Sequence, residues 1–242
     1  MTSFAKPSHT HPIGSTDLRD YYEKQGEAAL NADGLIRCSE EPNTQIVLRM
    51  MTERLADFEN VLDVGCGANL IVDQAMVRMG KAVVGLDFTW SFLKLAPKNS
   101  GVSLVQGNAL TLPFRDGTYD AVICSETLEH IPNDLTVVDE LARLLCPRGW
   151  LFFTVPNLWN ADRVITMIKG LQLRVDLMPG HLREYSLRKV KIILEPHFDI
   201  ERIYPVGFGW GGSPFGGRIE WLIEHGWLPR LTRSIALAAR KR

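Results

Sequence analysis

The sequence predicts an α/β fold in which a mostly parallel sheet is covered by helices on both faces. From residue 60 onward, short apolar runs alternate with stretches of helical pattern. The runs are largely continuous, without a polar residue at every second position, and this is typical of parallel strands buried on both faces. Strands of this kind that alternate with helices form a parallel sheet with a helical layer on each side.

The expected elements follow in order along the chain. Strands are expected at 61–64, 82–86, 102–106, 119–125 and 150–155, and helices at about 70–79, 90–96 and 134–146. The alternation stops after Pro156. A helix is then expected from Ser186, a residue type that favours the N-cap position, to about Glu195. Strands at 198–205 and 234–241 complete the sheet.

The remaining segments are expected to surround this sheet. Residues 1–15 are rich in Pro, Ser, Thr and His and are predicted to be a mobile arm. Residues 16–242 then form a single domain, in which 16–58 make a helical cover at the N-terminus. Two further segments, 157–183 and 206–230, break the pattern with apolar, aromatic and glycine-rich stretches. We expect them to pack as insertions on the side of the sheet where an acceptor would bind.

Composition excludes several classes of protein. Lys and Arg number 27 and Asp and Glu number 28, so the net charge of −1 gives no overall attraction to nucleic acid. The 4 cysteines form no C-x-x-C pair, which favours a reducing compartment without a disulfide framework. The N-terminus lacks the apolar segment of a signal peptide, and no apolar run approaches the ~20 residues that span a membrane. We therefore expect a cytoplasmic protein.

The stretch VLDVGCGAN (61–69) places Gly65 and Gly67 directly after a buried strand and before a helix. Glycine has no Cβ and tolerates positive φ, so the backbone here can approach a ligand closely. The following helix supplies free N–H donors. A tight turn without a ligand is the alternative interpretation.

Asp87 ends the next strand, 22 residues after Gly65. At this position an acid accepts hydrogen bonds from the ribose of a bound nucleotide. Its alternative role is the N-cap of the helix that starts near Thr89.

Two further motifs extend this pattern. GNALTLPF (107–114) follows the third strand, and YDAVICSETLEHI (119–131) contains the fourth. Together with VLDVGCGAN and VVGLDF, in this order, they resemble the motifs of the class I S-adenosylmethionine-dependent methyltransferases over roughly residues 58–156. A dehydrogenase would favour a third glycine, where residues 70–72 are Leu, Ile and Val. The resemblance implies a Rossmann-like sheet of seven strands, the last one antiparallel, with an insertion after the fifth strand.

The resemblance also implies which residues bind the cofactor. The glycine loop would approach the methionine part of S-adenosyl-L-methionine, with Asp63 beneath it, while Asp87 would hold the ribose and Asn108 would contact adenine. The predicted cofactor-binding residues are Asp63, Gly65, Gly67, Asp87, Phe88, Asn108, Ala109 and Ser125. Asn108 departs from the family's usual Asp, and its amide oxygen can still accept a hydrogen bond. Asn69 departs from the family's glycine, and we expect its side chain to cap the next helix and shape the loop.

Glu126, Glu129 and His130 form the pattern E-x-x-E-H at the end of the fourth strand. On a helix these offsets place all three on one face, and carboxylates with a neutral imidazole are a metal-ligand set. With His181, the arrangement resembles quinone-pathway O-methyltransferases and small-RNA terminal 2′-O-methyltransferases, in which such a cluster binds a divalent cation. We therefore predict Glu126, Glu129, His130 and His181 as ligands of Mg²⁺ or another divalent cation, and His130, Glu129 and His181 as catalytic. A metal-free general base at His130 and a purely structural role are the alternatives.

The predicted function is methyl transfer to an oxygen of a small-molecule, lipid-like or sugar acceptor. The apolar insertions favour an apolar acceptor, and HLREYS (181–186) either lines its pocket or anchors the following helix. Residues 218–229 place apolar side chains on one helical face, which predicts packing on the sheet or a peripheral membrane contact. Two alternatives stay open. One is an RNA 2′-O-methyltransferase with a divalent metal, which the balanced charge disfavours. The other is an S-adenosylmethionine-binding protein that transfers no methyl group.

Overall fold

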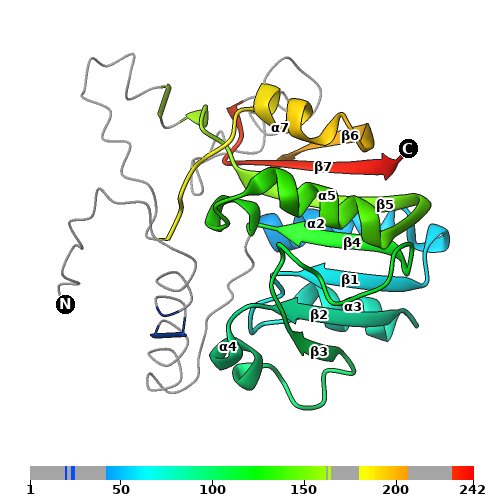
Figure 1. Cartoon of the computed structure of the whole chain (residues 1–242). Helices are drawn as coiled ribbons and strands as arrows, with labels where there is room; N and C mark the ends of the chain where they lie inside the picture. The colour runs from blue at the N-terminus through cyan, green and yellow to red at the C-terminus, as the bar shows by residue number, and fades with distance from the viewer. Residues whose placement is uncertain (1–19, 21–22, 25–41, 162, 165–179, 207–230) are drawn as a thin grey trace, which may run out of the picture.

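Figure 1 shows the computed structural model of the chain, which describes residues 20, 23–24, 42–161, 163–164, 180–206 and 231–242. Seven strands form one sheet in the order β3-β2-β1-β4-β5-β7-β6. Strands β1 to β5 pair in parallel, and β7 runs antiparallel to both of its neighbours. The structure therefore confirms the predicted Rossmann-like, mostly parallel sheet with an antiparallel last strand.

The described elements agree closely with the expected ones. The strands are β1 (Asn60–Val64), β2 (Ala82–Asp87), β3 (Ser103–Gln106), β4 (Tyr119–Ser125), β5 (Leu145–Pro156), β6 (Phe198–Val206) and β7 (Ser234–Lys241). The helices are α2 (Pro42–Thr52), α3 (Ile71–Arg78), α4 (Trp90–Leu95), α5 (Asp134–Leu144) and α7 (Leu187–Leu194), with short 3₁₀ helices η1 (Leu55–Asp57) and η2 (Leu128–His130). The predicted N-cap of α7 is confirmed, because the Ser186 hydroxyl accepts a hydrogen bond from Lys189 N.

The sheet has an apolar core on each face. Successive residues of a strand point to opposite faces, and in β1 Leu62 and Val64 enter one core cluster while Val61 enters the other. Helices α5 and α7 contribute their buried residues to the first cluster, and α2 and α3 contribute theirs to the second. Burial on both faces explains why the parallel strands lack polar alternation.

Strand β5 starts earlier than its apolar run. We expected the preceding helix to reach residue 146 and the strand to begin at 150. In the structure α5 ends at Leu144 and β5 begins at Leu145. Its pairing with β4 shifts register, because Tyr119 pairs with Leu145 but Ala121 pairs with Trp150. Residues 146–149 of β5 thus lie opposite the single residue Asp120 of β4. A strand interrupted in this way has no regular sequence pattern by which it could be predicted.

Several predicted segments lie outside the described residues. They are the arm at 1–15, much of the 16–58 cover, the stretch 165–179 of the first insertion, and 207–230. The predicted membrane contact through 218–229 belongs to this part of the chain. None of the described helices is both long and apolar enough to cross a membrane.

Candidate functional site

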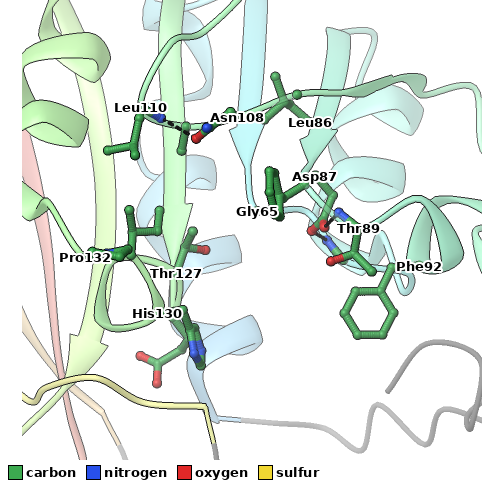
Figure 2. A pocket seen from close by; sticks show the side chains of 16 residues that line it. Gly65, Leu86, Asp87, Thr89, Phe92, Asn108, Leu110, Thr127, His130 and Pro132 are labelled. Carbon is green, nitrogen blue, oxygen red and sulfur yellow. Dashed lines mark hydrogen bonds between the residues drawn. The ribbon is translucent and has the colours of Figure 1, made fainter. Parts of the chain in front are cut away.

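A cavity of about 240 Å³ lies where β1, β2 and β4 end. The loops after these parallel strands converge on it, which is the place where open α/β sheets bind ligands. In Figure 2, Asp87, Thr89 and Phe92 stand on one side of the cavity and Thr127, His130 and Pro132 on the other. Most of the lining is apolar with a few polar groups, as in small-molecule sites generally.

The glycine loop is shaped by a close neighbour. Gly65 has φ of +82°, and a Cβ placed on it would lie 2.3 Å from Thr127 Oγ1. Gly67 also has positive φ, +61°, but a Cβ there would meet nothing within 4 Å among the described residues. Gly65 is therefore required by the fold, and Gly67 faces open space.

Helix α3 follows Leu70, an N-cap residue at φ 51° whose side chain makes no capping hydrogen bond. The N-cap position that we expected Asn69 to serve thus belongs to Leu70.

Asp87 connects the glycine loop to α4. Its Oδ2 accepts a hydrogen bond from Gly67 N at 2.9 Å, and its Oδ1 accepts one from Thr89 N at 2.8 Å. Burial raises the pKa of this carboxyl, and the hydrogen bonds act in the opposite direction. A carboxylate oxygen can accept more than one hydrogen bond, so Asp87 can fix the loop and still accept from a ligand in the cavity that it lines.

The GNALTLPF loop is held in place from α5. Asn108 Oδ1 accepts a hydrogen bond from Leu110 N at 2.9 Å, which turns the loop. Arg143 then donates to Leu112 O at 3.0 Å and to Phe114 O at 2.9 Å. These contacts fix the backbone that carries Asn108 and Leu110 into the cavity.

A buried threonine connects the ends of β4 and β5. Thr154 is fully buried, and its hydroxyl donates to Glu126 Oε1 at 3.0 Å. The Ser125 hydroxyl lies 2.9 Å from Thr154 Oγ1 and donates to it, because the Thr154 proton is already used. Glu126 N also donates to Thr154 Oγ1, at 3.1 Å. Glu126 has φ of 48°, a strained conformation for a residue with a side chain. This network holds the Glu126 carboxylate at the edge of the cavity.

Glu129, His130 and His181 form a compact group beside the cavity. Their ligand atoms lie within 4.8 Å of one another. Glu129 Oε1 lies 3.7 Å from His130 Nε2 and 3.9 Å from His181 Nε2. Glu129 is completely buried, and among the described residues neither of its carboxyl oxygens has a hydrogen-bond partner. An orphaned buried carboxyl of this kind is costly, and a ligand is one way to compensate for it.

The protonation of this group follows from its burial. Burial, and then the nearby Glu126 carboxylate, raise the pKa of Glu129 to about 9. Burial lowers the pKa of His130, and burial with the neighbouring imidazole lowers that of His181 to about 4. His130 Nδ1 lies 3.0 Å from the Gly180 carbonyl, which can only accept. In the neutral ring Nδ1 therefore carries the proton and Nε2 is the basic atom.

The segment that carries His181 is fixed to this group. Leu182 N donates to Glu129 O at 2.9 Å. Arg183 forms an ion pair with Asp134 at 3.2 Å and donates to the Pro132 carbonyl. The Tyr185 hydroxyl is buried and lies 3.3 Å from the Asp134 carboxylate, and Glu184 pairs with Arg163. Of the two interpretations of HLREYS, these contacts support anchoring.

Comparison with known proteins finds a family that matches part of the chain. The family described as "Methyltransferase domain" matches residues 62–153. These residues form a methyltransferase domain. The chain is 35% identical over 133 residues to a ubiquinone biosynthesis O-methyltransferase of Paracidovorax citrulli (strain AAC00-1), covering 52% of this chain and 55% of that protein. A protein of the same name from Chromobacterium violaceum is 34% identical over 137 residues, which cover 53% and 57% of the two chains. The chain thus spans little more than half the length of these relatives.

Solved structures share the architecture of this methyltransferase domain. The cyclase SpnF has a TM-score of 0.60 at 18% identity, covering 82% of this chain and 81% of the other. An S-adenosylmethionine-dependent methyltransferase from Mesorhizobium loti has a TM-score of 0.55 at 15% identity, covering 80% and 95%. At these identities the likeness concerns the fold alone. The methyltransferase family implies S-adenosylmethionine as the cofactor.

The methyltransferase domain gathers most of the predicted site residues. Of the 8 predicted cofactor residues, Gly65, Gly67, Asp87, Phe88, Asn108 and Ala109 line the cavity. Asp63 and Ser125 are absent from its lining; Ser125 hydrogen-bonds to Thr154. The expectation that one helix presents the whole E-x-x-E-H pattern is wrong, because η2 begins only at Leu128. Glu126 precedes it in the left-handed region and lies outside the group formed by Glu129, His130 and His181.

Sequence analysis missed several residues that the site uses. Thr127 packs directly against Gly65, and Phe92, Ile131 and Pro132 also line the cavity. Thr154 lies one strand away from the motif that it supports. Their positions depend on the pairing of β4 with β5 and on loop conformations, which a motif does not encode. A polar residue inside the apolar run of β5 is the one feature that could have pointed to Thr154.

Proposed function

We propose that this chain transfers a methyl group from S-adenosylmethionine to an oxygen of a small acceptor, with a divalent cation held by Glu129, His130 and His181. The observation that carries the proposal is the orphaned Glu129 carboxyl between two neutral imidazoles, directly beside the cavity of a methyltransferase domain. Carboxylate and imidazole donors on a buried site are a ligand set for a divalent ion.

The residues of the cavity fit S-adenosylmethionine, whose sulfonium carries the electrophilic methyl group. The Asp87 carboxylate would accept from the ribose hydroxyls, and the apolar walls at Leu86 and Leu110 would enclose the adenine. Gly67, where a Cβ would point into open space, leaves room for the methionine part to approach the backbone. This arrangement would orient the methyl group toward the side of the cavity where Thr127 and His130 stand.

The acceptor side is built to handle a proton. Methyl transfer to a hydroxyl requires that the oxygen lose its proton. A bound divalent cation would lower the pKa of that hydroxyl and fix its position. His130 would supply Nε2 as a ligand of the cation, with Gly180 O holding the ring in the required tautomer, and the hydroxyl proton would pass to solvent. Glu129 would release its own proton when the cation binds, because metal ligands must be deprotonated.

The acceptor is proposed from the relatives. Proteins named for ubiquinone biosynthesis match the chain across its methyltransferase domain, so we propose a hydroxylated intermediate of that kind of pathway. This favours a small-molecule acceptor over RNA. The likeness of the fold to a cyclase keeps a non-methylating function as the second candidate, since a fold does not fix the chemistry.

Metal analysis and methyl transfer test the proposal together. Wild type is expected to bind a divalent cation with a stoichiometry near one, and a chelator should remove its transfer of labelled methyl groups to a hydroxylated quinone precursor. Glu129→Gln should lose both the metal and the activity. His197→Asn is the matched control, because His197 pairs with Asp139 at an exposed position away from the cavity. Full activity in chelator would leave His130 as a metal-free base, and cofactor binding without any transfer would favour the non-methylating candidate.

A further inference from the structure

Glu126 is a cavity carboxylate that the proposed cation site does not include. It lines the cavity, and it lies outside the group that would hold the cation. The fully buried Thr154 donates its hydroxyl to Glu126 Oε1 at 3.0 Å, and Ser125 donates in turn to Thr154 Oγ1 at 2.9 Å. Hydrogen bonds donated to a carboxylate stabilise its ionised form. The network therefore holds a negative charge in a fixed place at the cavity.

The permanent charges of the cavity lining are negative. Among the described residues that line the cavity, Asp87 and Glu126 are the carboxylates, and none is Lys or Arg. Burial lowers the pKa of His130, the remaining titratable residue of this lining, and favours its neutral form. Most of the lining is apolar, and charges interact more strongly across an apolar cavity than in water. A cationic ligand is therefore favoured over a neutral one of the same shape.

The position of Glu126 relates its charge to the sulfur of the cofactor. Glu126 immediately precedes Thr127, whose side chain packs against Gly65 of the glycine loop. In the proposed arrangement that loop would bind the methionine part, and the methyl group would be directed toward Thr127 and His130 (Figure 2). The sulfur carries both the methionine chain and the methyl group, so it would lie between these two parts. Of the two lining carboxylates, Glu126 is thus the one on the methyl side, whereas Asp87 would face the ribose.

We propose that Glu126 is a specificity-determining residue, whose carboxylate selects S-adenosylmethionine with its sulfonium charge over the product S-adenosylhomocysteine with its neutral sulfur. The inference rests on the proposed function, because that function places this cofactor in the cavity. Methyl transfer breaks the bond between sulfur and the methyl carbon, returns its electron pair to sulfur and forms the bond to the acceptor oxygen. The sulfonium charge disappears in this step. The attraction to Glu126 is then lost, and release of the product is favoured.

Calorimetry on the full chain, in chelator and without an acceptor, compares the affinities for the cofactor and its product. Wild type is expected to bind S-adenosylmethionine about tenfold more tightly than S-adenosylhomocysteine, because an opposite charge nearby stabilises the bound sulfonium. Sinefungin, in which a carbon that bears an ammonium group replaces the sulfonium, should also bind more tightly than S-adenosylhomocysteine. This third ligand carries the positive charge without a sulfonium, so it separates the effect of charge from that of sulfur chemistry.

Glu126→Gln removes the charge but keeps an oxygen that can accept a hydrogen bond from Thr154. The preference for S-adenosylmethionine over S-adenosylhomocysteine should fall about tenfold in this variant, through weaker binding of S-adenosylmethionine alone. Glu59→Gln is the matched control and should keep the wild-type preference. Glu59 precedes β1 at the end opposite the cavity, and its side chain is 71% exposed and pairs with Lys81.

The comparison of the three ligands in wild type does not depend on the folding of any variant. Equal affinities of wild type for all three, or an unchanged preference in folded Glu126→Gln, would overturn the inference while leaving the proposed function intact. Failure of wild type to bind any of the three ligands would instead contradict the proposed function.

Discussion

Replacing Gly65 with alanine should destabilise the protein far more than replacing Gly67. Both glycines have positive φ, so each alanine carries a backbone cost of ~1–2 kcal/mol. The lower entropy of the unfolded alanine chain offsets ~0.4–1 kcal/mol of that cost. For Gly65→Ala alone, the new Cβ would lie 2.3 Å from Thr127 Oγ1 and 2.6 Å from Thr127 Cγ2.

Thr127 has to move to accept this methyl group. Its hydroxyl donates to Ser125 O at 3.0 Å and to Val64 O at 3.2 Å, and the displaced side chain loses this shared hydrogen bond. The lost hydrogen bond costs ~0.5–1.5 kcal/mol, and an off-rotamer side chain costs a similar ~0.5–1.5 kcal/mol. The free energy of unfolding should therefore fall by ~2–4 kcal/mol in Gly65→Ala and by about 1 kcal/mol in Gly67→Ala.

Urea unfolding of wild type and both variants measures this difference. Adding Thr127→Ala to Gly65→Ala removes the two closest atoms, so the cost of the glycine substitution should shrink in that background. Relative to the stability that each variant loses, Gly67→Ala should weaken cofactor binding more than Gly65→Ala does. The methyl group that Gly67→Ala introduces would point into open space in the cavity. Equal destabilisation by the two single variants would refute the account of the loop.

Three further predictions concern groups that support the site. Thr154→Val should lower kcat while leaving cofactor affinity nearly unchanged, because Thr154 holds Glu126 without lining the cavity, and Thr154→Ser should restore the rate in steady-state assays. Without added metal, the free energy of unfolding should fall as pH rises between about 5 and 9, by at most about 1.4 kcal/mol per pH unit. The stability falls with rising pH because the pKa of Glu129 is about 9 in the folded state against the usual 4.5, so the folded state binds the extra proton. If the slope of wild type persisted in Glu129→Gln, a group other than Glu129 would be its cause. Arg143→Lys should destabilise the GNALTLPF loop and weaken cofactor binding several-fold in calorimetry, because an ammonium group cannot reproduce the guanidinium contacts with Leu112 O and Phe114 O; unchanged affinity would contradict that role.

The sequence predicted the sheet well because its information is local. Continuous apolar runs such as AVVGL and VICS mark buried parallel strands, and the glycines and Asp87 mark the ends of two of them. The start of β5 at Leu145 was missed, because its pairing with β4 skips several residues and leaves no periodic pattern.

The site was predicted in outline but not in mechanism. The order of the motifs predicted most of the residues that line the cavity, yet the E-x-x-E-H motif wrongly placed Glu126 on a helix with Glu129. The support that Thr154 gives to Glu126 depends on the pairing of β4 with the neighbouring strand β5. Contacts between residues that are distant in the chain follow from packing, and no single motif contains them.

The central claim is that the cavity at Asp87 binds S-adenosylmethionine, and calorimetric titration of that ligand into the full chain tests it most directly. Wild type should bind one equivalent. Asp87→Ala should weaken binding at least tenfold, because hydrogen bonds to a charged group contribute ~1.5–3 kcal/mol each. Asp199→Ala, at an exposed ion pair with Arg242, is the control and should bind as wild type does. No binding by wild type, or equal affinity in wild type and Asp87→Ala, would contradict the account.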